Sequence, residues 1–261
     1  MDLNLNGKSA LVSGSTQGIG KAIAIELANL GASVTLLARK EDKLNEVKDE
    51  LFHTSGQKHQ ILVADFAKPN ELKSVIDEHI KTNQYHILVN NTGGPPGGQA
   101  IDADLEAFRI AFNQHLICNQ ILAQATVPFM KEEGFGRVIN VISTSVKAPL
   151  VGLGVSNTIR GAVGNWSKTL ANELGQFGIT VNNVLPGATA TQRLSSIIEN
   201  KANKLGKTIE EVEDKMRSEI PAKRFAEAEE VAAAAAFLAS PAAGYINGIN
   251  VPVDGGRTPS L

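Results

Sequence analysis

Short apolar segments alternate with helical segments along most of the chain, and this alternation limits the fold more than any other feature. Residues 9–12 form an apolar, β-branched run, and residues 19–30 repeat apolar side chains at helical spacing. Continued alternation predicts an α/β fold with a single Rossmann-type, doubly wound parallel sheet of about seven strands and helices on both faces. Strands are predicted at 9–12, 32–37, 59–64, 86–90, 137–142, 180–185 and 249–253, and helices at 19–30, 41–54, 69–82, 104–133, 155–176 and 227–238.

A glycine-rich turn joins the first strand to the first helix. Its spacing is G-x-x-x-G-x-G, and not the G-x-G-x-x-G of the common dinucleotide fingerprint. Glycines let the backbone turn tightly and approach a pyrophosphate, while the new helix directs free N–H groups at the phosphates. The turn predicts a phosphate-binding loop, with a plain strand-to-helix connection as the alternative. The predicted loop comprises Gly14, Ser15, Thr16, Gln17, Gly18, Ile19 and Gly20.

Composition narrows the function classes. The 261 residues, 43% of them hydrophobic, suit one large domain over 1–261. A formal charge of −2 and scattered Lys and Arg argue against nucleic acid and anionic membranes as partners. Cys118 is the only cysteine, so we predict no metal site and a reducing compartment. With no leader-like start and no long apolar run, we expect a cytoplasmic protein.

Two segments stand apart from the regular alternation. Residues 192–223 are more polar and charged than the rest, and we predict a mobile substrate lid there. Residues 93–98 read Gly-Gly-Pro-Pro-Gly-Gly, which is richer in turn residues than a simple connection requires. This loop could form one wall of a ligand cleft or could be an ordinary turn.

Several short motifs follow the glycine turn in a fixed order. Asp65 and Phe66 follow the third predicted strand, and Asn90-Asn91-Thr92-Gly93 follows the fourth. Pro186-Gly187 with Thr191 follows the sixth, and Asp254-Gly255-Gly256 follows the last. With these motifs in register, the chain resembles the short-chain dehydrogenase/reductase family over essentially its whole length, and most of all the 3-oxoacyl-carrier-protein reductase branch. The resemblance implies that the glycine turn binds a dinucleotide.

The resemblance also implies roles for individual residues. Asp65 matches the acid that reads the adenine, although an Asp there could instead cap the helix that begins at Pro69. Thr191 matches the segment beside the nicotinamide, although it could simply cap the next helix. The cofactor-binding residues predicted beyond the glycine turn are Arg39, Asp65, Phe66, Asn91, Gly93, Pro186, Gly187 and Thr191.

The choice of cofactor depends on the end of the second strand. An NAD site needs a carboxylate there for the ribose, whereas an NADP site needs a positive charge for the 2′-phosphate. The sequence has Ala38, Arg39 and Lys40 at this corner, and a guanidinium can pair with phosphate through several donors. We therefore predict NADP(H), with NAD(H) less favoured. The alternative is that Arg39 is an ordinary surface residue.

The catalytic positions depart from the family pattern. The family carries a Ser, a Tyr and a Lys at fixed spacing, and the matching positions are Ser143, Ser156 and Arg160. The two tyrosines of the chain, Tyr85 and Tyr245, lie elsewhere in the sequence. His115 takes the place of the Asn that kinks the long helix in the family. The resemblance therefore implies a divergent form without the catalytic Tyr and Lys.

These four residues could still support chemistry. Ser156 and Arg160 lie four apart, so both fall on one helix face. A serine hydroxyl is a poor proton donor at neutral pH, but Arg160 could bind ribose hydroxyls or polarise a carbonyl oxygen. His115 would titrate near neutrality and could replace the missing acid, or it could be a hydrogen-bonded core residue. Ser143 follows the fifth strand, where ligands dock in open sheets.

The preferred hypothesis is an NADP(H)-dependent oxidoreductase that reduces a carbonyl to an alcohol, or the reverse, in an atypical site. The alternatives are a catalytically silent dinucleotide-binding sensor or oligomer partner and, less favoured, a lyase or isomerase. The resemblance implies a homodimer or homotetramer built through the two long helices. An apolar stripe on the second of these agrees with that idea and comprises Ile159, Val163, Trp166 and Leu170.

Overall fold

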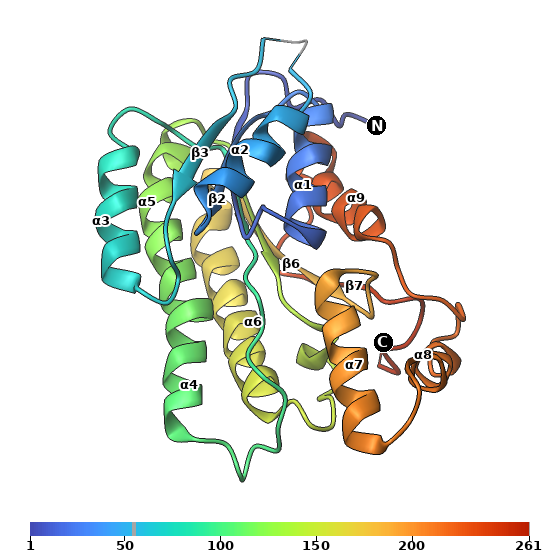
Figure 1. The fold of residues 1–261 in the computed structure, drawn as a ribbon. Helices are drawn as coiled ribbons and strands as arrows, with labels where there is room; N and C mark the ends of the chain where they lie inside the picture. Colours follow the sequence, from blue (N-terminus) through green and yellow to red (C-terminus); the bar gives the residue numbers. More distant parts are fainter. Residues whose placement is uncertain (54–55, 261) are drawn as a thin grey trace.

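The computed structural model describes residues 1–53 and 56–260, and a parallel sheet lies at its centre (Figure 1). In this described part of the chain, seven strands pair in the order β3-β2-β1-β4-β5-β6-β7, and every pairing is parallel. The predicted fold class is therefore confirmed. The strands are β1 (Ser9–Ser13), β2 (Ser33–Ala38), β3 (Gln60–Val63), β4 (Ile87–Asn90), β5 (Gly136–Val141), β6 (Ile179–Pro186) and β7 (Asn250–Val253).

Helices cover both faces of the sheet because neighbouring residues of each strand point to opposite sides. Ala10 and Val12 of β1 join the core under α1, α2 and α9, whereas Leu11 joins the core under α3, α5 and α6. Figure 1 shows α1 and α9 together on one side and α3 and α5 on the other. The main helices are α1 (Gly18–Asn29), α2 (Glu41–Glu50), α3 (Pro69–His79), α4 (Leu105–Phe112), α5 (Cys118–Glu132), α6 (Gly154–Leu174), α7 (Gln192–Leu205), α8 (Ile209–Ser218) and α9 (Ala228–Ala239).

The strand order reverses direction between β1 and β4. The chain builds β2 and β3 on one side of β1 and then returns to add β4 to β7 on the other. Ligands of open α/β sheets bind in the crevice at the carboxyl ends of the strands at such a switch point. The glycine turn follows β1 and Asn91 follows β4, so both lie at this crevice.

The predicted long helix 104–133 is not regular. It consists of α4, one π-helical turn over Asn113–Ile117, and α5. Asp104 caps α4 by accepting a hydrogen bond from the Glu106 N–H at 2.9 Å. A π-helical turn inside an α-helix is a common feature of functional sites. Here it carries His115, which is buried.

Two predicted helices end earlier than the periodicity suggests. The helix predicted over 41–54 ends at Glu50, because the backbone of Leu51 becomes extended, with ψ 138°. Its predicted last residue, Thr54, lies outside the described residues. The helix predicted over 69–82 ends at His79, followed by an irregular turn.

The segment 192–223 folds into α7 and α8 and has a small core of its own. Leu194, Ile198 and Met216 are among the residues that pack there. Thr208 and Glu211 start α8 with a capping box, and Arg257 near the C-terminus pairs with Glu219 at 2.9 Å. The segment is thus structured, and its action as a lid stays a prediction.

The apolar stripe of α6 packs largely within the chain. Ile159 and Val163 are buried in internal clusters, and the Trp166 indole N–H donates to the Gln120 amide oxygen at 2.7 Å. The stripe is therefore explained by internal packing, and oligomer formation stays a prediction. Among the described residues, we find no helix with the length and apolarity needed to cross a membrane.

Candidate cofactor and catalytic site

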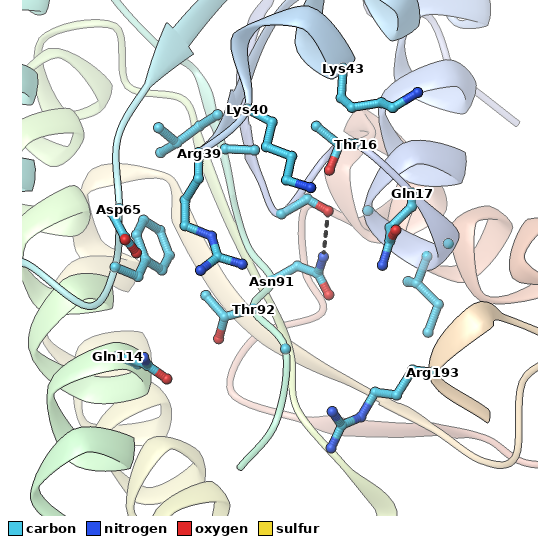
Figure 2. A pocket seen from close by; sticks show the side chains of 18 of the residues that line it. Thr16, Gln17, Arg39, Lys40, Lys43, Asp65, Asn91, Thr92, Gln114 and Arg193 are labelled. Atoms are coloured by element: carbon cyan, nitrogen blue, oxygen red, sulfur yellow. Dashed lines mark hydrogen bonds between the residues drawn. The ribbon is translucent and has the colours of Figure 1, made fainter. Parts of the chain in front are cut away.

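A cavity of about 630 Å³ opens at the carboxyl ends of β1, β2, β3 and β4 (Figure 2). It lies at the switch point of the sheet, where the topology predicts a ligand. Its volume is in the usual range for small-molecule and cofactor sites. The predicted residues that line it are Gly14, Thr16, Gln17, Gly18, Ile19, Gly20, Arg39, Asp65, Phe66, Asn91, Gly93 and Thr191.

The glycine turn adopts a conformation that side chains would disturb. Gly14 and Gly18 have φ of +61° and +53°, in the left-handed region that favours glycine. At Gly20, an added Cβ would collide with the Gly14 carbonyl oxygen and the Asn91 amide. Gln17 precedes α1 and makes no side-chain cap, so the first N–H groups of the helix lack a side-chain partner beside the cavity. This arrangement suits an anionic group such as a pyrophosphate.

Asn91 fastens the turn to the end of β4. Its side-chain amide donates to the carbonyl oxygens of Ser13 and Gly14 at 3.3 and 3.2 Å. Its backbone N–H donates to the Ser13 hydroxyl at 2.9 Å. Ser15 is fully buried and donates to the Leu37 carbonyl at 3.5 Å, so its side chain faces the interior of the protein. Asn91 and Ser15 thus hold the turn in place from the side that faces the protein interior.

Positive side chains gather at one end of the cavity. Arg39 and Lys40 follow β2, and Figure 2 shows both directed into the pocket. Lys43 of α2 also lines it but pairs with Glu46 at 2.6 Å. Within residues 1–53 and 56–260, no ion pair involves Arg39 or Lys40. Arg39 and Lys40 are therefore available to bind an anionic group of a ligand.

Asp65 lines the same end of the cavity. Its Oδ1 accepts from the Ala67 N–H at 2.9 Å, which closes a short turn after β3. The N-cap residue of α3 is Lys68, so the alternative in which Asp65 caps this helix is wrong. Its other carboxylate oxygen has no recorded hydrogen bond in the described part of the chain.

A buried polar group adjoins Thr92, which lines the cavity, but its members His115 and Arg160 are not among the described residues of the lining. The Nδ1 of His115 lies 2.6 Å from the Thr92 hydroxyl. Arg160 of α6 donates from Nη1 to the Val141 carbonyl at 3.0 Å and from Nη2 to the Thr92 carbonyl at 3.3 Å. Thr92 therefore brings His115 and Arg160 together. In the described structure, His115 Nε2 and Arg160 Nε are buried without a partner.

The protonation of this group differs from the sequence-based expectation. Burial, and then the charges of Arg160 and Arg193, lower the pKa of His115 to about 3. His115 is therefore neutral at pH 7, and the expectation that it titrates near neutrality is wrong. Burial also lowers the pKa of Arg160 to about 10, so this guanidinium remains charged at pH 7.

The two predicted serines lie between His115 and Arg160 in the sequence. Ser143 begins a short helical turn over Thr144–Val146 and accepts from the Ser145 N–H at 3.1 Å. Ser156 lies on α6 one turn before Arg160 and is partly buried. Pro186 is the last residue of β6, and Gly187 follows it. Of these described residues, none directly lines the cavity.

Both tyrosines lie away from the cavity. Tyr85 is buried in the core and donates to the Thr35 hydroxyl at 2.9 Å, and burial raises its pKa to about 12. Tyr245 is fully exposed ahead of β7. Nor does any cluster of three or more His, Cys, Asp or Glu side chains suited to a metal occur in the described ranges.

The site can now be compared with known proteins. A family model described as enoyl-(acyl carrier protein) reductase matches residues 14–258. The chain belongs to the short-chain dehydrogenase/reductase family. The match begins at Gly14 of the glycine turn and extends past Asp254, so it includes every described residue that lines the cavity.

Individual members of this family align over the whole chain. NADPH-dependent reductase BacG of Bacillus subtilis is 31% identical over 98% of this chain and 100% of its own length. The 7alpha-hydroxysteroid dehydrogenase of Escherichia coli K12 is 32% identical over 100% of this chain and 98% of its own. The structure of L-sorbose reductase from Gluconobacter frateurii, complexed with NADPH and L-sorbose, has a TM-score of 0.93 at 32% identity and full coverage of both chains.

Some residues of this short-chain dehydrogenase/reductase site were not predicted. Lys40 and Lys43 adjoin Arg39 at the cationic corner, and Gln114 and Arg193 also line the cavity. Lys40 follows Arg39 in the chain and could have been predicted from the sequence for the same reason. Arg193 is the second residue of α7, and its direction depends on how that helix docks, which local sequence does not determine.

Proposed function

We propose that the chain is an NADP(H)-dependent oxidoreductase that interconverts a carbonyl compound and an alcohol. The observation that carries the proposal is that Arg39 and Lys40 form no ion pair with any described residue and lie beside a glycine turn with positive φ and the N-terminus of α1. The turn and the N-terminus of α1 would hold the pyrophosphate, and the cationic corner would hold the 2′-phosphate. Support also comes from relatives whose names specify NADPH.

The remaining predicted residues would complete the cofactor site. Asp65 and Phe66 would border the adenine, and Gly93 and Thr191 would border the nicotinamide half, with Pro186-Gly187 behind it. When bound, NADPH supplies the hydride for reduction. The chain's own residues must then orient the carbonyl, stabilise the negative charge that develops on its oxygen and supply a proton to that oxygen.

We infer that the carbonyl is reduced in an atypical site. Ser156 and Arg160 take the positions that resemble the family's Tyr and Lys, while Tyr85 and Tyr245 lie away from the cavity. Ser143 and Ser156 would orient the carbonyl by hydrogen bonds, and the charged Arg160 would stabilise negative charge on its oxygen. Because His115 is neutral at pH 7, the proton would come from water, with the His115–Thr92 pair able to relay it.

A catalytically silent dinucleotide sensor is the second candidate. It is favoured by the absence of both tyrosines from the cavity lining in the described structure. The two candidates share cofactor binding and differ only in turnover. The 3-oxoacyl substrate class, the cytoplasmic location and the lid over 192–223 remain further proposals.

The first test is the cofactor preference of an Arg39→Ala variant. Loss of a charge-assisted contact to the 2′-phosphate should raise the Kd for NADPH roughly 10- to 100-fold and leave the Kd for NADH nearly unchanged. Fluorescence titration of both nucleotides measures this. Arg109→Ala is a matched control, because Arg109 is exposed on α4 and pairs with Glu106. An unchanged preference for NADPH in Arg39→Ala would contradict the assignment.

The second test separates the enzyme from the sensor. NADPH oxidation is followed with a panel of ketones, sugars and oxoacyl thioesters after binding has been shown. Turnover of any carbonyl supports the oxidoreductase. Tight NADPH binding without turnover on the whole panel would favour the sensor.

A further inference from the structure

Arg193 is a cationic residue of the cavity that the cofactor assignment does not use. It lies in the first turn of α7, and its Nη2 donates to the Pro95 carbonyl at 3.3 Å. Figure 2 shows it away from Arg39 and Asp65, on the side of the cavity that follows β4. One long hydrogen bond leaves most of the guanidinium donors free.

No carboxylate of residues 1–53 or 56–260 forms an ion pair with Arg193. In the described part of the protein, neither Arg193 nor Arg160 forms an ion pair, and Asp65 is the one acidic residue that lines the cavity. Asp65 lies at the adenine end, with Arg39. Arg160 is buried, and a charge that is removed from water without an ionic partner is costly, whereas Arg193 stays exposed at the mouth of the cavity. An anion bound in the cavity would balance both charges.

Arg160 lies close behind Arg193, and Gly94 lies between them. A Cβ built on Gly94 would be 2.9 Å from Arg193 Nη2 and 3.6 Å from Arg160 Nη2. The two guanidinium groups therefore approach the same backbone position, and the charge of Arg193 contributes to the lowered pKa of Arg160. The unpartnered, buried Nε of Arg160 is a second sign that a polar group is missing here.

We propose that Arg193 binds a carboxylate on the carbonyl substrate, with the positive charge of Arg160 behind it favouring the anion. The proposal rests on the proposed function, because it assumes that the cofactor's phosphates occupy the glycine turn and the cationic corner. A planar guanidinium can hold a carboxylate through two parallel hydrogen bonds. The substrate class is then an oxo acid and not a neutral ketone.

The reaction leaves the carboxylate unchanged. In reduction, the carbonyl carbon gains a hydride from NADPH, the carbonyl oxygen takes a proton from water, and the products are the hydroxy acid and NADP⁺. The contribution of Arg193 is to position the substrate so that its carbonyl lies near Ser143 and Ser156.

Paired probes test this proposal. Levulinate, acetoacetate and pyruvate are each compared with their methyl esters, which keep the carbonyl and lose the charge. Wild-type protein should show higher kcat/KM for the acids than for the esters. In Arg193→Gln, kcat/KM for the acids should fall roughly 10- to 100-fold, mainly through KM, with little change for the esters. Lys204→Gln is the control, because it removes the same charge from the exposed end of α7.

The outcomes separate this proposal from the proposed function. Esters turned over as well as acids would overturn the carboxylate site while leaving the oxidoreductase intact. A weaker affinity of Arg193→Gln for NADPH, with equal loss on acids and esters, would assign Arg193 to the cofactor and also overturn it. If no probe is reduced, the proposed function has failed for oxo acids and their esters. Calorimetry with the protein–NADP⁺ complex then tests carboxylate binding by Arg193 without turnover. Binding of levulinate that is lost in Arg193→Gln then supports it, and no binding overturns it.

Discussion

Thr92 lines the cavity and contacts the two buried polar side chains behind it. Its hydroxyl meets His115 and its carbonyl meets Arg160, so one residue connects a neutral imidazole with a buried guanidinium. The charge of Arg160 helps to keep His115 unprotonated, and a neutral imidazole has one ring nitrogen that donates a hydrogen bond and one that accepts. The site thus places a neutral imidazole beside a fixed positive charge.

The lowered pKa of His115 makes folding stability depend on pH. The pKa of His115 is about 3 in the folded protein and close to the ordinary 6.5 in the unfolded chain, so between these pH values the unfolded chain binds more protons. The free energy of unfolding should therefore fall as the pH drops below 6.5, by up to about 1.4 kcal/mol per pH unit from this residue.

Denaturant unfolding at a series of pH values measures this slope. His115→Gln removes the titration and should give a shallower slope than the wild type. His53→Gln, at an exposed position after α2, is the matched control and should follow the wild type. Equal slopes for His115→Gln and wild type would show that His115 does not carry this effect.

At the scale of elements, four asparagines connect the strands near the site. Asn90, Asn140, Asn183 and Asn250 are register partners on β4, β5, β6 and β7. Their side-chain amides are hydrogen-bonded in series at 2.8, 3.1 and 2.8 Å. Asn140 also donates to the Ser167 hydroxyl of α6 at 3.2 Å. The series fixes the spacing of the strand ends and links them to the helix that carries Arg160.

Asn140→Ala should lower the free energy of unfolding by about 2–4 kcal/mol. The variant removes three hydrogen bonds and leaves buried partners on Asn90, Asn183 and Ser167 unsatisfied. Urea denaturation measures the loss. Asn165→Ala, at an exposed position of α6, is the control and should change stability by no more than about 0.5 kcal/mol. A similarly small change in Asn140→Ala would show that the series is not important for stability.

The elements differ in how well sequence predicts them. The strands and the glycine turn could be predicted because their signals are local: apolar runs for the strands, and glycines at Gly14 and Gly18 where φ is positive. The π-helical turn at His115 could not be predicted from periodicity, because its residues fit ordinary helical spacing; only the family's kink at this position pointed to it. The pKa of His115 was also beyond reach, because it depends on burial beside Arg160 and Arg193, which are distant in the chain.

At the scale of the whole molecule, apolar side chains remain exposed near the outer ends of α4 and α6. Ile101, Leu105 and Val151 have 88%, 69% and 103% of their surfaces exposed. The two loops that carry Ile101 and Val151 are joined by backbone hydrogen bonds between Gly98 and Gly152 at 2.7 Å and between Gly154 and Gly98 at 2.9 Å. Exposed apolar groups that gather on one surface are typical of protein interfaces.

We therefore expect the protein to form a homodimer or homotetramer that buries this surface. Sedimentation equilibrium should give a mass of two or four times the 27.6 kDa chain. The double variant Leu105→Glu/Val151→Lys should shift the mass toward that of one chain, because a stable interface of roughly 800 Å² per partner does not tolerate unpaired charges at its centre. Leu205→Lys, which changes an exposed apolar residue at the end of α7, should leave the mass unchanged. A wild-type protein that sediments as one chain at tens of micromolar would contradict the expectation, and a double variant with the wild-type mass would place the interface elsewhere.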